Sequence, residues 1–489
     1  MAASCLVLAA MVTGSACSGG AHKTGGRHKL DLKIGDLVPI SGVEQPFGAT
    51  GEKATNLAVQ EIRKAIKQVK TDHTISIDHQ NTRSDPQIAT ELAGKLQRAG
   101  TSCLVGPWDT QGVIAVASNV AIRKKVVEIT PGATSDALGV LEKGGYLNRT
   151  IPPSRVQGAA LATLISSELK RAKNKKVSVG AIDNIYGRGL LKSFTSAWRK
   201  LGGKITAQVV YAQNLPDYKK QANELVAKNP DAFVFFDFQD SYTRIATELL
   251  KTHKWRADKT FSTDALAVGT LGQSGGATAA GLRGVAPSWP RVGPLAQDFQ
   301  RLWNAGPPPK YRQPYDTQAF DAVVLCYLSA VAAGSTSGSD MRTWVRRVSS
   351  PPGTKYTWRQ LPQAIQALEA GKDIDYEGAS GPIDMEPLDP TQPAEPTAGF
   401  YDAYRFQDAR LALYASVSVP PIGKGVDRIP LEFVTPRVPG VGPQPTVGAS
   451  GASGASGASG ATGARRRAAK QQAAKRQAAR RKARQKKKG

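Results

Sequence analysis

The chain has 489 residues and a formal net charge of +26, so it is strongly basic and long enough for two or three domains with buried cores. The charge is uneven, because 13 Lys and Arg residues and no acid lie between Arg465 and Lys488. The rest of the chain is only mildly basic, which argues against a nucleic-acid-binding body, and we expect no nucleic-acid partner.

The first predicted element is an export leader. An apolar run over 6–12 and small residues over 13–16 precede Cys17. This pattern is typical of a secretory leader and is too short to remain as a membrane span. The residues from Gly14 to Cys17 also resemble a bacterial lipobox, with Gly where Leu is usual, which implies lipid on Cys17; cleavage without lipid is the alternative. We expect an exported protein, either lipid-anchored at the outer face of the cytoplasmic membrane or periplasmic.

Alternating strands and helices follow a short polar linker over 18–28. The strands are apolar runs, and the helices between them carry apolar residues at helical spacing. This alternation predicts βαβ units and parallel sheets that are covered on both faces. The expected strands are 33–39, 75–78, 102–105, 126–130, 177–182, 209–211 and 232–236, and the expected helices include 51–70, 88–98 and 319–333.

Proline and glycine breaks divide this α/β pattern into segments. Breaks near 150–153 and 281–285 indicate a crossing into a second lobe and a return, and a third crossing is expected near 349–353. From about Pro420 the chain is rich in Pro and Gly and then in Gly-Ala-Ser triplets, before a basic tail that has no apolar face and should be disordered alone. The predicted segments are 1–17 (leader), 18–28 (linker), 29–150 and 282–352 (first lobe), 151–281 and 353–420 (second lobe), 421–463 (linker) and 464–489 (polybasic tail).

The stretch from Val126 to Ser135 carries the clearest prediction of a binding site. An apolar run stops at Pro131-Gly132 and resumes at Thr134. This is typical of a buried strand, a tight turn and a helix N-cap. The first turn of such a helix presents free backbone N–H groups, so it is suited to seat a carboxylate. A later junction of the same kind carries Asp264, and we expect the two junctions together to hold both ends of an amino acid.

Cysteine and histidine usage argues against metal and thiol chemistry. Cys103 lies in a predicted strand and Cys326 in a predicted helix, and we expect both to be small buried apolar residues; a bridge between them is the alternative. The five histidines show no metal-ligand spacing, and the chain has no P-loop and no nucleophile motif. We expect a protein that is not an enzyme and that has no metal or cofactor.

Short motifs between 37 and 384 carry a family resemblance. They are Leu37-Val38-Pro39-Ile40-Ser41-Gly42 with Phe47-Gly48, Val105-Gly106-Pro107, Thr130-Pro131-Gly132-Ala133-Thr134, Asp183-Asn184-Ile185-Tyr186-Gly187 and Tyr376-Glu377-Gly378-Ala379-Ser380-Gly381-Pro382-Ile383-Asp384. In this order they resemble the type I periplasmic binding proteins, above all the leucine/isoleucine/valine-binding branch that serves ABC importers. The resemblance runs from about Lys29 to about Ser418. It implies two Rossmann-like lobes with parallel sheets, joined by three crossovers, with ligand held in the cleft between them.

The resemblance implies where the carboxylate of an amino acid would bind. It would sit at two first-lobe turns, one with Thr110 and Gln111 and the other with Gly132, Ala133 and Thr134. The Thr134 hydroxyl and N–H would donate to it, and the Gly132 carbonyl would accept from the ammonium. Charge-assisted bonds of this kind contribute about 1.5–3 kcal/mol each. The alternative role for Thr134 is a simple N-cap.

The resemblance also implies the ammonium site and the pocket walls. Asp264 falls where the family carries an acid that faces the ammonium; the alternative is a helix N-terminal acid or a solvated loop charge. Tyr186 and Phe238 match wall positions in the second lobe, and Phe47 and Phe320 match wall positions in the first. Aromatic rings there would shield an aliphatic group from water. The alternative for each ring is a place in the core.

The turn from Trp108 to Gly112 departs from the branched-chain pattern. It is one residue longer, and it adds Asp109 beside the presumed carboxylate seat. An acid at this place opposes an anionic ligand group. The class of ligand therefore stays open to a polar amide, a small peptide or an aromatic acid.

These observations predict an extracytoplasmic solute-binding protein that delivers an amino acid or a related small polar solute to an ABC importer. Lobe closure on the ligand would present both lobes to the permease subunits in the membrane. One alternative is a ligand sensor on the same fold. Another is a surface or cell-wall-binding protein, in which Arg465–Lys488 holds anionic lipid or a wall polymer.

Overall fold

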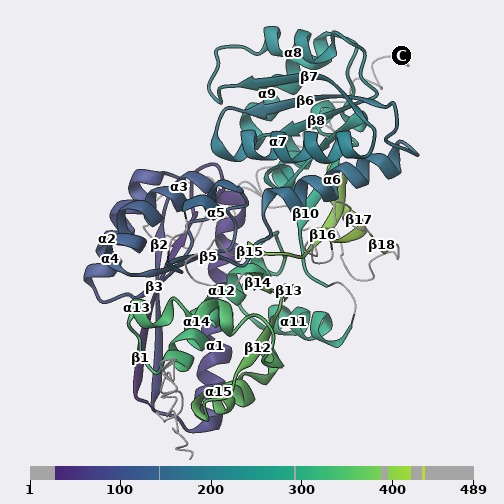
Figure 1. Cartoon of the computed structure of the whole chain (residues 1–489). Coiled ribbons are helices and arrows are strands. Elements are labelled where there is room, and N and C mark those ends of the chain that lie inside the picture. The colour runs from purple at the N-terminus through teal and green to yellow at the C-terminus, as the bar shows by residue number, and fades with distance from the viewer. Residues whose placement is uncertain (1–27, 142–143, 291–292, 387–394, 420–431, 435–489) are drawn as a thin grey trace, which may run out of the picture. The chain divides into compact units, whose positions relative to one another are not determined.

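The computed structural model describes residues 28–141, 144–290, 293–386, 395–419 and 432–434 (Figure 1). The chain separates into a unit over 1–445 and a second over 446–489, and all the described residues belong to the first. The predicted leader with Cys17 and the polybasic tail lie outside the described residues, as does the linker over 421–463 except for 432–434. None of the described helices is both long enough and apolar enough to cross a bilayer.

The first sheet consists of five parallel strands in the order β2-β1-β3-β4-β5. Its central strands are short and fully buried, as expected for apolar runs covered on both faces. The predicted strands over 33–39, 75–78, 102–105 and 126–130 are confirmed with small shifts at their ends. The strands are β1 Leu30–Val38, β2 His73–Asn81, β3 Cys103–Val105, β4 Val127–Thr130 and β5 Leu147–Arg149.

Helices pack on this sheet, and α12 is the most deeply buried of them. Its sequence is apolar on every side, so nearly all of its residues are buried between β1, β3 and β4 of the sheet and the helices α1, α14 and α15. Helices of this part are α1 Gly48–Val69, α2 Pro86–Arg98, α3 Thr110–Val116, α4 Ile122–Lys124, α5 Ala137–Leu141, α11 Pro294–Ala305, α12 Asp316–Ala333, α13 Gly338–Met341, α14 Trp344–Arg347 and α15 Leu361–Glu369. A π-helical turn, Ala117–Ala121, joins α3 to α4, and 3-10 turns lie at Gln45–Phe47 and Trp358–Gln360.

The second sheet has eight strands in the order β18-β17-β16-β10-β9-β8-β6-β7. Apolar residues of α6 and α7 cover one face, and those of α8 and α9 cover the other (Figure 1). The strands are β6 Lys176–Ile182, β7 Lys204–Tyr211, β8 Ala232–Phe236, β9 Thr260–Ser262, β10 Arg283–Pro287, β16 Gly399–Gln407, β17 Arg410–Val419 and β18 Glu432–Val434. The helices are α6 Ser154–Glu168, α7 Ile185–Lys200, α8 Lys219–Val226, α9 Gln239–Lys251 and α10 Gly269–Ser274, with 3-10 turns at Ala257–Lys259, Asp264–Leu266 and Gly276–Thr278.

The second sheet adds antiparallel strands to its parallel part, which the sequence did not indicate. Strands β16, β17 and β18 join its β10 edge in antiparallel pairs. The pair β16–β17 turns tightly through Asp408 and Ala409, both at positive φ, so the two strands need no crossover helix.

At two of the predicted crossing points, the chain changes lobe later than the sequence indicates. The strand β10 pairs with β9 in the second sheet, so the chain leaves that sheet after Pro287 rather than near 281. The region after 353 does not return to the second lobe at once. A small sheet in this region contacts α15, and α15 packs on α1 of the first lobe. Its strands are β11 Thr354–Thr357, β12 Ile374–Gly378 and β13 Gly381–Pro382.

The physical reason for the later crossing lies at Asp321 of α12. Its buried carboxylate accepts from the Tyr376 hydroxyl at 2.8 Å, from the backbone N–H of Ala379 at 2.8 Å, and from the N–H and hydroxyl of Ser380 at 2.8 and 2.6 Å. These bonds hold the segment over 374–382 on the first lobe. After a further short strand pair, β14 Met385–Glu386 with β15 Glu395–Pro396, the chain reaches the second sheet at Gly399.

Cys103 and Cys326 form a disulfide, so the expectation of two free cysteines is wrong and the alternative holds. Both residues are fully buried, as predicted. The bond joins β3 to α12 across 223 residues of sequence, with the Cα atoms 6.0 Å apart. No pattern around either cysteine specifies the other, because the pairing depends on how α12 packs against the sheet. A structural disulfide is typical of proteins outside the reducing cytosol.

Candidate ligand-binding site

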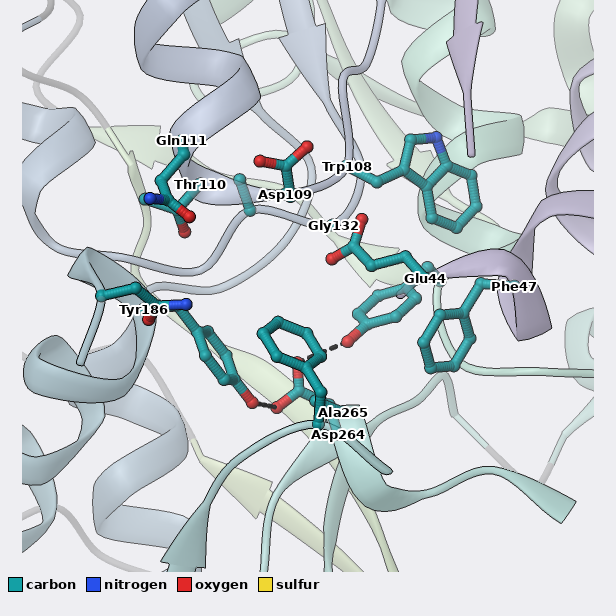
Figure 2. A pocket seen from close by; sticks show the side chains of 14 residues that line it. Glu44, Phe47, Trp108, Asp109, Thr110, Gln111, Gly132, Tyr186, Asp264 and Ala265 are labelled. Carbon is teal, nitrogen blue, oxygen red and sulfur yellow. Dashed lines mark hydrogen bonds between the residues drawn. The ribbon is translucent and has the colours of Figure 1, made fainter. Parts of the chain in front are cut away.

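A cavity lies at the carboxyl ends of strands from both sheets (Figure 2). This is the edge at which open α/β sheets hold ligands, because the loops after neighbouring strands meet there. The loop after β1, the turns after β3 and β4 and the residue before α12 contribute from the first lobe, and the turns after β6, β8 and β9 from the second. The lining residues are Glu44, Phe47, Trp108, Asp109, Thr110, Gln111, Gly132, Ala133, Asn184, Tyr186, Phe238, Asp264, Ala265 and Tyr315.

Asp264 is the acid at the second-lobe wall, and it is 2% exposed. Its Oδ1 accepts from Gln157 Nε2 at 2.6 Å and from the Tyr186 hydroxyl at 3.0 Å, and its Oδ2 accepts from the Tyr315 hydroxyl. Figure 2 shows the Tyr186 hydroxyl directed at this carboxylate. Burial raises the pKa of Asp264, while the three neutral donors oppose that rise. Asp264 is therefore a buried acid whose hydrogen-bond donors Gln157, Tyr186 and Tyr315 are all neutral.

Aromatic rings form much of the remaining wall. Tyr186 and Phe238 stack with their ring centroids 5.5 Å apart in the second lobe. In the first lobe, Tyr315 meets Phe47 edge-to-face at 5.0 Å and Trp108 at 5.7 Å. Such rings exclude water from an enclosed group and offer their negative faces to a cation.

The turn before α3 does not present a free carboxylate seat. Asp109 caps this helix itself, with its Oδ1 accepting from the Gly112 N–H at 2.6 Å. The chain's own carboxylate therefore takes the place at the helix N-terminus that the resemblance reserves for the ligand. The other oxygen, Asp109 Oδ2, is buried and has no hydrogen-bond partner in the described structure. Burial raises the pKa of Asp109 despite its backbone donors.

The turn after β4 is satisfied internally as well. The Thr130 hydroxyl accepts from the N–H of Ala133 at 3.2 Å and, more weakly, from that of Gly132 at 3.4 Å. Asn184 caps α7 in the same manner, with its side chain accepting from the Gly187 N–H at 2.8 Å. Three backbone turns at the cavity therefore have donors that already bond oxygen atoms of the chain.

Thr134 lies away from the cavity lining. It is 1% exposed, and its carbonyl accepts from the Ser154 N–H at 2.6 Å and from Arg149 Nη1 at 3.0 Å. Its hydroxyl lies 3.3 Å from that of Ser154. It is not an N-cap either, since the first helical N–H after the turn, that of Ala137, bonds the Ser135 hydroxyl at 3.2 Å. The polar groups of Thr134 therefore tie the first crossover to the β4 turn, and its contact with a ligand carboxylate stays a prediction.

Phe320 also differs from its predicted place, since it lies in the core rather than on the cavity wall. It packs edge-to-face against Phe299 at 5.1 Å and Trp358 at 5.8 Å. The other predicted ligand contacts all line the cavity, and their contact with a ligand stays a prediction. They are Phe47, Thr110, Gln111, Gly132, Ala133, Tyr186, Phe238 and Asp264.

Sequence reasoning missed two lining residues that matter for the chemistry, Glu44 and Tyr315. Glu44 follows β1, and the rule that loops at strand carboxyl ends form the site could have found it. Its Oε2 is buried without a hydrogen-bond partner in the described structure, and burial together with the nearby Asp109 and Asp264 carboxylates raises its pKa well above the usual value. Tyr315 precedes α12 in a proline-rich loop at a positive φ of 77°, and no sequence pattern indicates where its ring lies.

The chain belongs to the periplasmic binding protein family, whose model matches residues 31–397. It is 23% identical over 375 residues to the chemotactic signal transduction system substrate-binding protein BasB of Halobacterium salinarum, which covers 76% of this chain and 86% of that protein. It is 29% identical over 185 residues to Leu/Ile/Val-binding protein homolog 1 of Brucella melitensis, which covers 37% of this chain and 47% of that protein.

Solved structures share the fold. The leucine-binding protein LivK of Thermotoga maritima aligns with a TM-score of 0.61 at 19% identity, over 79% of this chain and 98% of that one. An ABC-transporter solute-binding protein of Rhodopseudomonas palustris, solved with 3,4-dihydroxybenzoic acid, aligns with a TM-score of 0.57 at 17% identity, over 79% of this chain and 97% of that one. The predicted family and the two-lobed α/β fold are confirmed, with Leu/Ile/Val-binding proteins among the relatives.

Proposed function

We propose that this chain is an extracytoplasmic solute-binding protein that closes its two lobes on an amino acid or a related small polar solute bearing an amino group. The observation that carries the proposal is the buried Asp264 carboxylate in a cavity lined from both lobes. A solute with an amino group would receive an anion from Asp264 and aromatic cover from both lobes. The family and the structural neighbours are solute-binding proteins, which supports a binding role rather than catalysis.

Delivery to an ABC importer is the first role that we propose. Closed lobes would present one combined surface to the permease subunits, and an open form would not. The buried Cys103–Cys326 disulfide supports an exported protein, as does the family name. We propose lipid attachment at Cys17 as the means that holds the protein at the outer face of the membrane.

Sensing is a second candidate role, and the relation to BasB favours it. That protein is named as the substrate-binding component of a chemotactic signal transduction system, and the match covers most of both chains. Lobe closure serves a receptor as well as it serves a permease, so the cavity alone does not separate the two roles.

A thermal-shift screen tests the binding proposal. The protein lacking residues 1–17 and 440–489 would be screened against α-amino acids, amino acid amides, amines, small peptides and aromatic acids. A ligand at 100 times its Kd adds about 2.7 kcal/mol to the stability of the native state, which raises Tm clearly. The proposal predicts a rise with at least one compound that has an amino group. No rise with any compound, or rises with aromatic acids alone, would contradict it. Uptake and chemotaxis assays with the compound that binds then separate import from sensing.

A further inference from the structure

The charged side chains that line the cavity are all acidic. Glu44, Asp109 and Asp264 line it, and none of its fourteen lining residues is Lys, Arg or His. A zwitterionic amino acid needs donors for its carboxylate as well as an anion for its ammonium. The cavity offers three acids and no basic side chain, so its charge complements only half of such a ligand.

Three backbone donors at the turns around the cavity are already engaged. The Gly112 N–H bonds Asp109 Oδ1, the Ala133 N–H bonds the Thr130 hydroxyl, and the Gly187 N–H bonds the Asn184 side chain. A ligand carboxylate at the α3 turn would have to displace Asp109 from its own cap and would lie beside a second negative charge. That arrangement is electrostatically unfavourable.

Buried polar atoms without partners are left over at the first-lobe wall, and two of them are carboxylate oxygens. Glu44 Oε2 and Asp109 Oδ2 are both buried and have no hydrogen-bond partner in the described structure. The Thr110 hydroxyl, on a residue that is 4% exposed, and the Trp108 indole N–H are in the same state, and both can donate. Figure 2 shows the Glu44 and Asp109 side chains on the first-lobe side of the cavity, across from Asp264. Buried polar atoms without partners are rare and costly, and two of these four are carboxylate oxygens, which can only accept when ionised.

An organic cation explains these features better than a metal ion does. The described residues contain no group of three or more His, Cys, Asp and Glu side chains that could share a metal ion. The spaces between the acids are instead walled by rings, with Trp108 and Tyr315 on one side and Tyr186 and Phe238 on the other. Aromatic faces beside carboxylates are suited to alkylammonium groups.

We infer that the solute is a small organic ammonium cation without a free carboxylate, such as an amine or an amino acid amide, rather than a zwitterionic amino acid. This inference rests on the proposed function, of which it narrows the ligand class. Its ammonium groups bind among Glu44, Asp109 and Asp264, and its carbon skeleton lies against the aromatic walls. Burial raises the pKa values of all three acids, and a bound cation would lower them.

Matched ligand pairs test the inference by calorimetry. Each α-amino acid is compared with its own carboxamide, so the side chain cancels and only the carboxylate differs; putrescine and choline are added as amines without a carboxylate. The inference predicts that a carboxamide binds at least tenfold more tightly than its parent acid, or that an amine binds when no acid does. An amino acid that binds as tightly as its carboxamide or more tightly would overturn the inference while the proposed function holds. If no compound bound, both the inference and the proposed function would be overturned.

Charge-removing variants give the second arm of the test. Glu44→Gln and Asp109→Asn each remove one negative charge with little change in shape, and Asn at 109 can still cap α3. We expect each to weaken cation binding at least tenfold. Glu224→Gln, on the exposed face of α8 and outside the cavity lining, removes the same charge and should leave the affinity within twofold. If all three variants weakened cation binding equally, only the overall charge would matter, and the assignment of the cation to this cavity would be overturned.

Discussion

Replacing Tyr315 by Phe should shift the balance between open and closed forms of the unliganded protein. The Tyr315 hydroxyl donates to Asp264 Oδ2, and this bond joins the first lobe, where Tyr315 precedes α12, to the second, where Asp264 follows β9. A hydrogen bond to a charged group contributes about 1.5–3 kcal/mol. Its loss should lower the ratio of closed to open forms about 10- to 150-fold, since about 1.4 kcal/mol corresponds to a factor of ten.

Tyr186→Phe is the matched control. Its hydroxyl donates to the other oxygen of the same carboxylate, at 3.0 Å, and its ring also lines the cavity. Tyr186 and Asp264 both belong to the second lobe, however, so this bond exists in the open and the closed form alike. Removing this bond should change the affinity for the ligand without changing the ratio of closed to open forms.

Pulsed electron spin resonance between labels on the two lobes measures the effect. Exposed positions are available at Arg98 of α2 and at Lys228 after α8. We expect the long-distance population to grow in Tyr315→Phe and to stay as in the wild type in Tyr186→Phe. Unchanged distances in Tyr315→Phe, or an equal change in both variants, would refute the role of this bond in closure.

Three further predictions concern stability and pH. Replacing Cys103 and Cys326 by Ala should lower the free energy of unfolding by about 2–5 kcal/mol, because the disulfide closes a loop of 223 residues in the unfolded chain. Asp321→Asn should lower it by about 3–5 kcal/mol, since four donors lose a buried carboxylate, and denaturant unfolding measures both. Cation affinity, measured by calorimetry, should fall as pH is lowered, because a bound cation favours ionised Glu44, whose pKa is raised by burial and by Asp109 and Asp264.

Each of these predictions has a control. The cysteine variant should resemble the wild type under reducing conditions, and equal stability of oxidised and reduced wild type would contradict the account of the disulfide. Asp340→Asn, on the short helix α13, should leave stability nearly unchanged; an effect as large as that of Asp321→Asn would contradict the buried network. Glu44→Gln should flatten the dependence of affinity on pH, and a cation affinity that does not change with pH in the wild type would contradict the raised pKa.

Periodicity was sufficient for the parallel part of the fold. The strand over 232–236 and the helix over 319–333 follow from apolar runs whose local spacing depends little on the rest of the chain. The sequence did not predict the antiparallel pair over 399–419, because its residues alternate irregularly in burial. Its partner in the sheet, β10, is also more than a hundred residues away. Pro351 and Pro352 were misleading, since a proline break marks a turn but not the lobe to which the chain then goes.

For the candidate site, too, the sequence predicted some of the lining residues but not how their groups are bonded. Turn residues such as Gly132 and Thr110 were predictable, because strand ends meet at one edge of a parallel sheet. The engagement of backbone donors at these turns could not be predicted, since it depends on side chains that fold back onto the turn, as Asp109 does on the Gly112 N–H at α3. Tyr315 reaches Asp264 only through tertiary packing, so the bond between the lobes could not be inferred from either segment alone.

The measurement that tests the central claim most directly is a calorimetric titration of the best compound from the thermal-shift screen into three proteins: the wild type, Thr110→Val and Asp264→Asn. Thr110→Val removes an unpaired buried hydroxyl from the first-lobe wall, and Asp264→Asn removes the buried charge from the second-lobe wall. If one solute bridges both lobes, the wild type binds one equivalent and both variants lose at least tenfold in affinity, about 1.4 kcal/mol or more. Wild-type affinity in either variant, with its fold intact by circular dichroism, would contradict the claim that the solute is held between the lobes.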